Sequence, residues 1–436
     1  MWSLVVTGID TQGLWSEKRM YNINKSNLLE PRHRVTISKG FLFFTLMLVA
    51  LITRGQAAQD QTDSVDDYLT AIDNIEAEHS AYSSRLSDLY MGLGQSYASN
   101  KEYSDALVAF QRGMQIERVN FGLHSLSQAP YLTSIAKTES NLGNQEKSLK
   151  ALNQIYQIST ESYGATDKRM IPVIDSLIDW HMNIYHQQRP KVGYNNLVMS
   201  EKLANEMHFI LDETTSLDNL EGPTYYRRIA DLHYVIADHI TKYGEPKDIG
   251  FSVSTGSDTR RSEARTSYRH FHHGKAALEK VVQTTIEQKN TSVVDKANVI
   301  ADLGDWYLLF GQKLTAIKTY QLAEELLDSD ENSESARQSL FGTPKIIDFG
   351  IKKKAQEATL SENQPVSVQV SMLISEGGVA SGFYLTDESE SLSDDEMKRL
   401  KKYFRSKRFR PRIVEHQAQE STHTVNYERP TVGVDD

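Results

Sequence analysis

The amino-acid sequence predicts a mostly α protein: an array of helical hairpins followed by a small α+β domain. Two observations lead to this prediction. Between residues 64 and 330, apolar and small residues recur with helical spacing, and the pattern itself repeats along the chain. Near the C-terminus the spacing changes to the two-residue alternation of a strand. Because one helical hairpin cannot bury its own apolar face, we expect the hairpins to stack on one another.

The first hairpin is predicted over Leu89–Arg118. Gly94 and Ala106 are small residues that let two helices approach closely, and Tyr97 and Phe110 fill the space beside them. Ala106 and Phe110 are four residues apart, which places them on one helix face. This pattern resembles the tetratricopeptide repeat, a helix–turn–helix unit of about 34 residues.

The aromatic–glycine connector after this hairpin occurs twice. Asn120-Phe-Gly122 is followed by Ser162-Tyr-Gly164, so the glycines are 42 residues apart (164 − 122). This period resembles the longer repeat of kinesin light chains. A third unit begins at Ile171, and a fourth is interrupted by the Gly- and Ser-rich stretch 245–260. The fifth unit matches the family at Gly304, Tyr307, Ala316 and Tyr320.

The resemblance implies a tetratricopeptide-type α-solenoid of about five helix pairs over residues 64–330. Such a solenoid has a concave groove, lined by the first helix of each unit, that binds peptides or helices. By family register, Gln95, Ser99 and Asp305 are the expected partner-binding positions. The predicted function is therefore a protein–protein interaction scaffold or adaptor.

A linker over 331–364 and a C-terminal domain over 365–430 are predicted next. Valines alternate with polar residues from Val366 to Met372, and Glu376-Gly-Gly378 supplies a turn. Ser393 and Glu396 form a capping box that begins a helix, and Ser421–Tyr427 forms the last strand. This β-β-α-β order, with the motifs EGGV and RFRP, resembles the C-terminal domain of TonB-type envelope proteins.

TonB proteins also have a membrane anchor and a Pro-rich spacer. This chain has 10 prolines in all, and repeats take the place of the spacer. An inner-membrane TonB-like energy transducer is therefore the alternative function. In either case we expect a protein or peptide partner in the bacterial envelope, with contact to the outer membrane or cell wall through the C-terminal domain.

The apolar run Phe41–Ile52 has basic residues before it and small residues, Gly55 and Ala57, after it. These features predict a signal peptide over 34–58 and a periplasmic location. As a helix, twelve residues span about 18 Å, against about 30 Å for a bilayer core. An uncleaved anchor in the inner membrane and a buried core helix are the alternatives. Residues 1–33 are unusual for a leader, which suggests that translation begins at Met20 or near Val35.

The composition excludes several classes of function. The net charge is −10 with a pI near 5.8, which argues against nucleic-acid binding. The absence of cysteine excludes disulfides, thiolate metal sites and a cysteine nucleophile. Neither a nucleophile motif nor a placed acid–base pair is present, so we predict that the chain is not an enzyme and has no cofactor.

Three local motifs have a chemical and a structural interpretation. Residues 345–351, KIIDFGI, resemble the magnesium-binding loop of protein kinases with Asp348 as ligand, but the other kinase motifs are missing, so we interpret the match as chance. His270 and His273 have helical i, i+3 spacing without a third ligand, so we predict packing and no metal site. Residues 398–412 contain nine basic residues, interpreted as a solvated helix face, with an anionic partner as the alternative.

Overall fold

The computed structural model describes residues 65–213, 222–245, 256–328, 333–350, 367–386 and 392–428. The predicted leader and the predicted signal segment over 34–58 lie outside these residues, as does most of the predicted insertion at 245–260. The chain divides into two units, Met1–Asp63 and Ser64–Asp436, and the described residues belong to the second.

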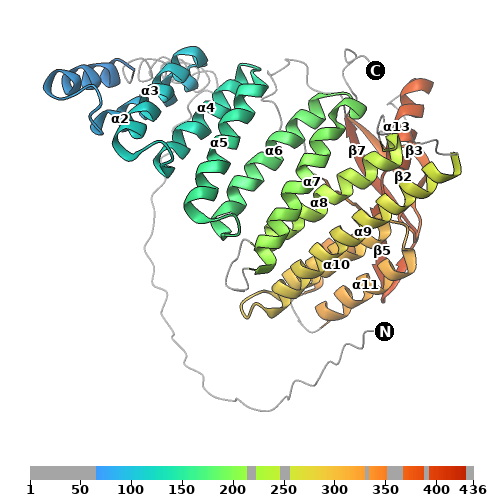
Figure 1. Cartoon of the computed structure of the whole chain (residues 1–436). Coiled ribbons are helices and arrows are strands. Elements are labelled where there is room, and N and C mark those ends of the chain that lie inside the picture. The colour runs from blue at the N-terminus through green and yellow to red at the C-terminus, as the bar shows by residue number, and fades with distance from the viewer. Residues whose placement is uncertain are drawn as a thin grey trace, which may run out of the picture. The chain divides into compact units, whose positions relative to one another are not determined.

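Five helix pairs follow one another after a first helix over 65–78 (Figure 1). Each pair packs side by side, and each also packs on the next pair. The pairs are α2 (Arg85–Ser99) with α3 (Tyr103–Phe121), α4 (Ala129–Asn141) with α5 (Gln145–Tyr163), α6 (Ile171–Gln187) with α7 (Pro190–Glu213), α8 (Gly222–Tyr243) with α9 (Gly256–Glu287), and α10 (Val293–Leu309) with α11 (Lys313–Leu327).

The predicted close approach within a pair is confirmed at both ends of the array. A Cβ atom on Gly94 would lie 2.5 Å from the ring of Phe110, and one on Gly304 would lie 2.4 Å from the ring of Tyr320. In both pairs the aromatic residue follows the glycine by 16 positions (110 − 94 and 320 − 304). Ala106 and Ala316 are fully buried, and Tyr97 and Tyr307 pack partly buried against the core.

The 42-residue period also appears in the backbone of the connectors. Gly122 and Gly164 both have positive φ, 97° and 90°, a conformation that glycine adopts without strain. Short 3-10 helices, Leu126–Gln128 and Lys168–Met170, then lead into α4 and α6. Ser125 and Asp167, again 42 apart, cap these two helices by accepting a backbone N–H two residues on.

The C-terminal domain has the predicted strand–strand–helix–strand order. Its antiparallel sheet has the strand order β3-β2-β7, formed by Ala380–Leu385, Ser367–Ile374 and Ser421–Glu428. α13 (Asp394–Ser406) begins at the predicted capping box, because Ser393 and Glu396 bond each other's backbone N–H. One face of β2 is buried against Leu400 and Phe404 of α13. The mostly α fold with a small α+β domain is confirmed.

The region predicted as a linker contains defined structure. α12 (Glu334–Phe341) packs on α10 and α11, and β1 (Lys345–Ile346) pairs antiparallel with β4 (Phe409–Arg410). A small hairpin of β5 (Arg412–Val414) and β6 (Gln417–Gln419) follows β4. One apolar core runs through the third, fourth and fifth helix pairs and takes in buried residues of the following chain: Leu340, Phe341, Ile347, Phe349 and Ile413.

In the part of the chain that the structure describes, the helices lack the combination of length and apolar character that a membrane span requires.

Candidate partner-binding face

The first helices of the pairs, α2, α4, α6, α8 and α10, present one side of the array, which we call the first-helix face. Lys137 and Asp179 lie one and two 42-residue periods after Gln95 (137 − 95 and 179 − 137), and Asp305 follows Gly304 as Gln95 follows Gly94. These four residues therefore occupy equivalent positions on the face. Gln95 and Lys137 are exposed, Asp179 is half-buried and Asp305 is buried. The face therefore changes from open at its N-terminal end to covered at its C-terminal end.

Residues Lys345–Gly350, which we call the docked segment, cover the first-helix face at α8 and α10. The backbone N–H of Gly350 donates to Oδ1 of Asp231 on α8 at 3.1 Å. The buried ring of Phe349 lies under the guanidinium of Arg227, at 4.0 Å, and its centroid is 5.4 Å from the indole of Trp306 on α10. The sequence that resembles a kinase loop thus packs through its aromatic residue.

Arg410 of β4 forms the most buried polar contact on this face. Its Nε and Nη2 donate to the two carboxylate oxygens of Asp305, at 2.9 and 2.7 Å, and Nη2 also donates to Asp302 at 3.2 Å. The hydroxyl of Tyr320 donates to Asp305 at 2.8 Å. Burial alone would lower the pKa of Arg410, but the Asp305 carboxylate raises it above its ordinary value, so the guanidinium stays charged.

Further acid–arginine pairs link the first helices to one another. Arg228 of α8 pairs with Asp175 and Asp179 of α6, and Arg227 of α8 pairs with Asp302 of α10. These side chains are each about a quarter to a third exposed, so each pair contributes about 0–1 kcal/mol. Their effect is to fill the face between α6 and α10 with internal contacts.

The β5–β6 hairpin makes a second contact with the array. The backbone N–H of His416 donates to Glu324 of α11 at 2.9 Å, and the side chain of Gln321 donates to the carbonyl of His416 at 2.6 Å. Glu415 and His416 both have positive φ, 50° and 61°, at the hairpin turn. The contact to α11 holds this strained turn in place.

The two motifs of the C-terminal domain, EGGV and RFRP, meet in space. The N–H of Phe409 donates to the carbonyl of Gly378 at 3.0 Å. A Cβ atom on Gly378 would lie 2.0 Å from the carbonyl oxygen of Phe409 and 2.9 Å from Leu308 of α10. Gly378 has φ of +70°, so both its conformation and this close approach favour glycine.

The structure does not bring the three predicted partner-binding residues into one site. Gln95 and Ser99 lie exposed on α2 at the N-terminal end, and the Ser99 hydroxyl donates to the carbonyl of Gln95 at 2.9 Å. Asp305 lies on α10, where Arg410 occupies its carboxylate. Gln95 and Ser99 are therefore accessible, whereas the carboxylate of Asp305 is already paired with Arg410 of the same chain.

Sequence reasoning missed the residues that cover the face. Two patterns in the sequence point to these contacts. Arg227 and Arg228 are adjacent, and Asp302 and Asp305 have i, i+3 spacing on one helix. Arg410 was interpreted with the solvated basic run, and that interpretation is wrong for this residue, which is 2% exposed.

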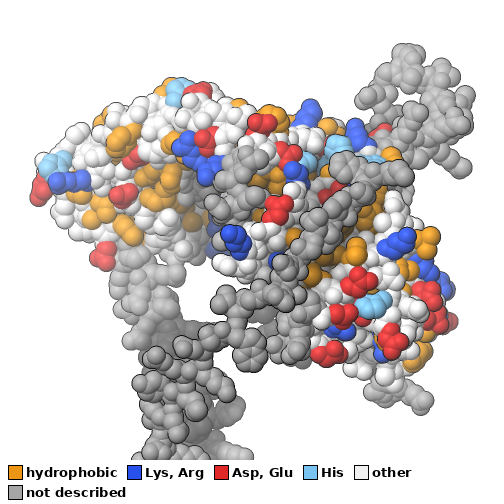
Figure 2. All heavy atoms as spheres, turned by 90° about the horizontal axis from the view of Figure 1, so that it is seen from below, with side chains coloured by type: hydrophobic (Ala, Val, Ile, Leu, Met, Phe, Trp, Pro, Cys, Tyr) orange, Lys and Arg blue, Asp and Glu red, His pale blue; other side chains and the backbone are white. Residues whose placement is uncertain are grey.

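The N-terminal helix pair also exposes apolar side chains. Val108, Val119, Phe121 and Leu123 on α3 and the connector after it are between 58% and 67% exposed. Figure 2 shows hydrophobic patches among charged side chains on the side that holds the N-terminal helices. Exposed apolar groups of this kind are typical of protein-contact surfaces when they gather in one place.

Comparisons with known proteins add a likeness of fold. No protein-family model and no curated protein matches the chain. The crystal structure of a kinesin light chain-like protein from Podosopora anserina, with nearly identical TPR-like repeats, is 13% identical, covers 57% of this chain and 98% of that chain, and has a TM-score of 0.36. BtubC (BKLC) from P. vanneervenii is 10% identical, covers 70% and 97%, and has a TM-score of 0.37.

Likenesses this distant carry no functional argument. The class of protein follows from the chain's own geometry: stacked helix pairs of the tetratricopeptide type, with glycine–aromatic contacts at fixed spacing, followed by a small α+β domain.

Proposed function

We propose that this protein is an interaction scaffold that binds a peptide or protein segment on the open, N-terminal part of its first-helix face. The observation that supports this proposal is the docked segment, which occupies the same face at α8 and α10 through one backbone hydrogen bond and a buried aromatic ring. A partner segment bound at α2 and α4 would use the same kinds of contact.

The chemistry of the open part favours a polar chain. Gln95, Ser99 and Lys137 are exposed there. The Gln95 amide and the Lys137 ammonium donate hydrogen bonds to carbonyl and carboxylate oxygens, and the Ser99 hydroxyl, which donates to the Gln95 carbonyl, accepts one. Backbone recognition combined with a few side-chain contacts is a common mode of peptide binding. The proposal assigns the chain no catalytic activity.

We further propose that the scaffold works in the bacterial envelope, exported by the segment 34–58. The support is the signal-type pattern of that segment together with the β-β-α-β domain, whose EGGV and RFRP motifs lie in contact. The second candidate, a TonB-like transducer at the inner membrane, is favoured by the same domain order. Sequencing the N-terminus of the mature protein separates the two, because the transducer retains residues 41–52 and the periplasmic scaffold lacks them.

Site-specific photo-crosslinking in intact cells tests the partner-binding proposal. A photoreactive residue placed at Gln95 or Lys137 is expected to capture a defined protein. The same residue at Gln111, which is exposed on the second helix α3, serves as the matched control. Equal capture from all three positions, or none from Gln95 and Lys137, would contradict binding on this face.

A further inference from the structure

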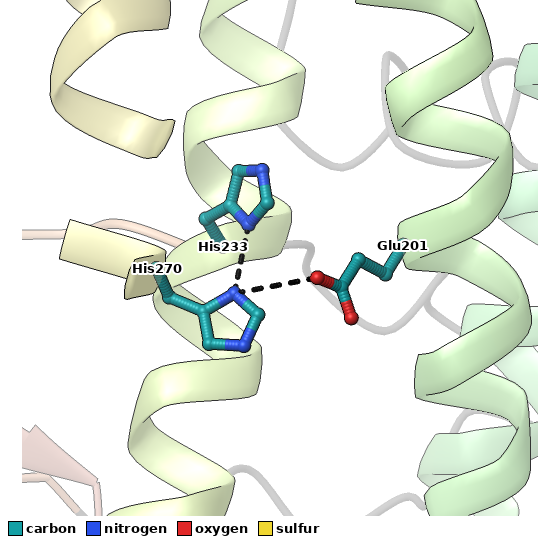
Figure 3. Close-up of side chains that lie close together, drawn as sticks. All are labelled: Glu201, His233 and His270. Carbon is teal, nitrogen blue, oxygen red and sulfur yellow. Dashed lines mark hydrogen bonds and ion pairs between the residues drawn. The ribbon is translucent and has the colours of Figure 1, made fainter. Parts of the chain in front are cut away.

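Glu201, His233 and His270 come together from three helices inside the array (Figure 3). α7 supplies Glu201, α8 supplies His233 and α9 supplies His270. The Nδ1 atoms of the two histidines are 2.9 Å apart, and Oε1 of Glu201 is 4.0 Å from Nδ1 of His270. One ligand-type atom of each residue lies within 4.8 Å of the other two.

The two histidines are buried without full hydrogen bonding. His233 and His270 are 0% and 1% exposed, and among the described residues the Nε2 atom of neither has a hydrogen-bond partner. Buried polar atoms normally have partners, and leaving one unpaired costs free energy. An ion bound through the two Nδ1 atoms would leave both Nε2 atoms as they are, so the support for a site is the convergence of the two Nδ1 atoms and the Glu201 carboxylate from three helices.

We propose that Glu201, His233 and His270 bind one divalent transition-metal ion such as Zn²⁺, with water in the remaining coordination position. Imidazole nitrogen and carboxylate oxygen are common zinc ligands, and three protein ligands plus water is a common zinc coordination. The chain has no cysteine, so thiolates do not compete for the ion.

The spacing of the ligand atoms is close to that of a metal site. With metal–ligand distances of about 2.0–2.1 Å in a tetrahedron, the ligand atoms are about 3.3–3.4 Å apart. The histidine pair would open by about 0.4 Å, and Glu201 would move about 0.6 Å toward His270. The third separation, between Glu201 and His233, is within 4.8 Å and would close by up to about 1.5 Å. Side-chain rotations supply movements of this size.

Two existing interactions compete with the metal, and the first is the hydrogen bond between the Nδ1 atoms of His233 and His270. In the second, Arg269 donates to Oε1 of Glu201 at 3.2 Å, but Arg269 is 54% exposed, and ion pairs of such exposed side chains are weak. Glu201 itself is 17% exposed, so one of the three ligands reaches solvent. The set differs from the pair with helical i, i+3 spacing, His270 and His273. His270 lies with His233 and Glu201. The ring of His273 lies 5.1 Å from that of His233 and is not one of the three ligands.

The ion would join two repeat units. α7 belongs to the third helix pair, and α8 and α9 form the fourth. An ion bound by all three helices would hold the two neighbouring units together. Because its binding requires the folded arrangement of these helices, the ion stabilises the fold. This inference is independent of the partner-binding proposal.

Titration of the full chain, without a histidine tag, with Zn²⁺ in a calorimeter tests the proposal. We expect one ion per chain, a higher melting temperature with Zn²⁺ than with a chelator, and a visible Co²⁺ spectrum of a four-coordinate site. Glu201→Gln keeps the shape of a partly exposed side chain and is expected to weaken binding at least about tenfold. His270→Gln removes a buried ligand and is expected to abolish the Co²⁺ spectrum.

His272→Gln is the matched control, because His272 is exposed on the same helix as His270. This variant is expected to bind Zn²⁺ as the unaltered chain does. The proposal is overturned if the chain binds no stoichiometric ion, or if folded Glu201→Gln binds Zn²⁺ with unchanged affinity. An ion lost only in His272→Gln would also overturn it.

Discussion

At the scale of single residues, glycines under aromatic rings set the distance between helices. Gly94 lies under Phe110, Gly304 under Tyr320 and Gly274 under Trp306, and in each case an added Cβ atom would lie within 2.5 Å of the ring. Well-packed interiors have no free space for an extra methyl group, so such a group forces side chains or backbone to move. Gly94 and Gly304 occupy the same position of a first helix, which explains the need for a small residue there, whereas Gly274 is on the second helix α9 and lies against α10 of the next pair.

Gly304→Ala is expected to destabilise the fold by about 1–3 kcal/mol, because the new methyl group overlaps the buried ring of Tyr320. Gly222→Ala is the control: a Cβ atom there meets nothing within 4 Å, and we expect a change within about 0.5 kcal/mol. Urea unfolding followed by circular dichroism measures both. Equal unfolding midpoints for the two variants would show that the close approach is not needed.

Buried histidines make stability depend on pH. Burial lowers the pKa of His181, against the opposing hydrogen bond to Asn196, and burial also lowers the pKa of His239. In the unfolded chain the pKa of histidine is about 6.5. The unfolded state therefore takes up protons first as the pH falls, so stability is fully present above about pH 6.5 and decreases below it.

We accordingly expect the melting temperature to fall between pH 7.5 and pH 5.5. His181→Gln is expected to reduce this fall, because it removes one of the buried groups that resist protonation. His272→Gln, at an exposed side chain, serves as the comparison. A melting temperature that rises toward pH 5.5 would contradict the sign of this prediction.

At the scale of elements, β4 connects the C-terminal domain to the array. It pairs with β1, its Phe409 bonds Gly378 of the β2–β3 hairpin, and its Arg410 reaches Asp305 of α10. A strand of two residues gains little from its own hydrogen bonds. We infer that the buried ion pair of Arg410 fixes its position.

Arg410→Met is expected to destabilise the fold by about 3–5 kcal/mol, because it leaves the Asp305 carboxylate buried without its cation. Arg412→Met, on the next strand and exposed, is expected to change little. Chemical unfolding measures both. If the double variant Arg410→Met with Asp305→Asn lost the sum of the two single effects, the two residues would not act as a pair.

Elements defined by local sequence could be predicted, and those that depend on distant contacts could not. The capping box of Ser393 and Glu396 and the strand pattern of β2 are local signals, and the capping box and the strand are both confirmed. Ser371, expected on the open face of β2, is buried between the hydroxyls of Thr386 and Thr424. The docked segment lacks such a signal, because Gly350 finds its partner Asp231 at a separation of 119 residues. α13 ends at Ser406, and Lys407 is already extended.

The candidate site also depends on contacts between residues that are distant in the sequence, and these could not be predicted. Family register predicted residues of the first-helix face, but it could not show which part of that face the chain covers itself. Arg410 looks like one more solvated cation in a basic run until its partner, 105 residues away, is known. The metal-ligating set was missed for the same reason, since its three residues come from separate helices.

At the scale of the whole molecule, the array and the following chain share one core across the third, fourth and fifth pairs. The C-terminal domain is therefore joined to the array by buried contacts, and the first-helix face is divided into a covered part and an open part. The covered part binds the chain's own segment, and we propose that the open part is left for a partner.

A cysteine pair tests this claim most directly, because the chain has no cysteine of its own. A Cβ atom on Gly350 would lie 3.3 Å from Cγ2 of Val235 on α8, which is within disulfide reach. We expect the full chain with Val235→Cys and Gly350→Cys to form an intramolecular disulfide under mild oxidation, whereas Val108→Cys with Gly350→Cys forms none. Gly350 has φ of +123°, so a side chain there strains the docked segment, and Gly350→Ala measures that strain without a thiol. If Gly350→Ala keeps the unfolding midpoint of the unaltered chain, free thiols in the first variant after oxidation contradict the docking of this segment on the first-helix face.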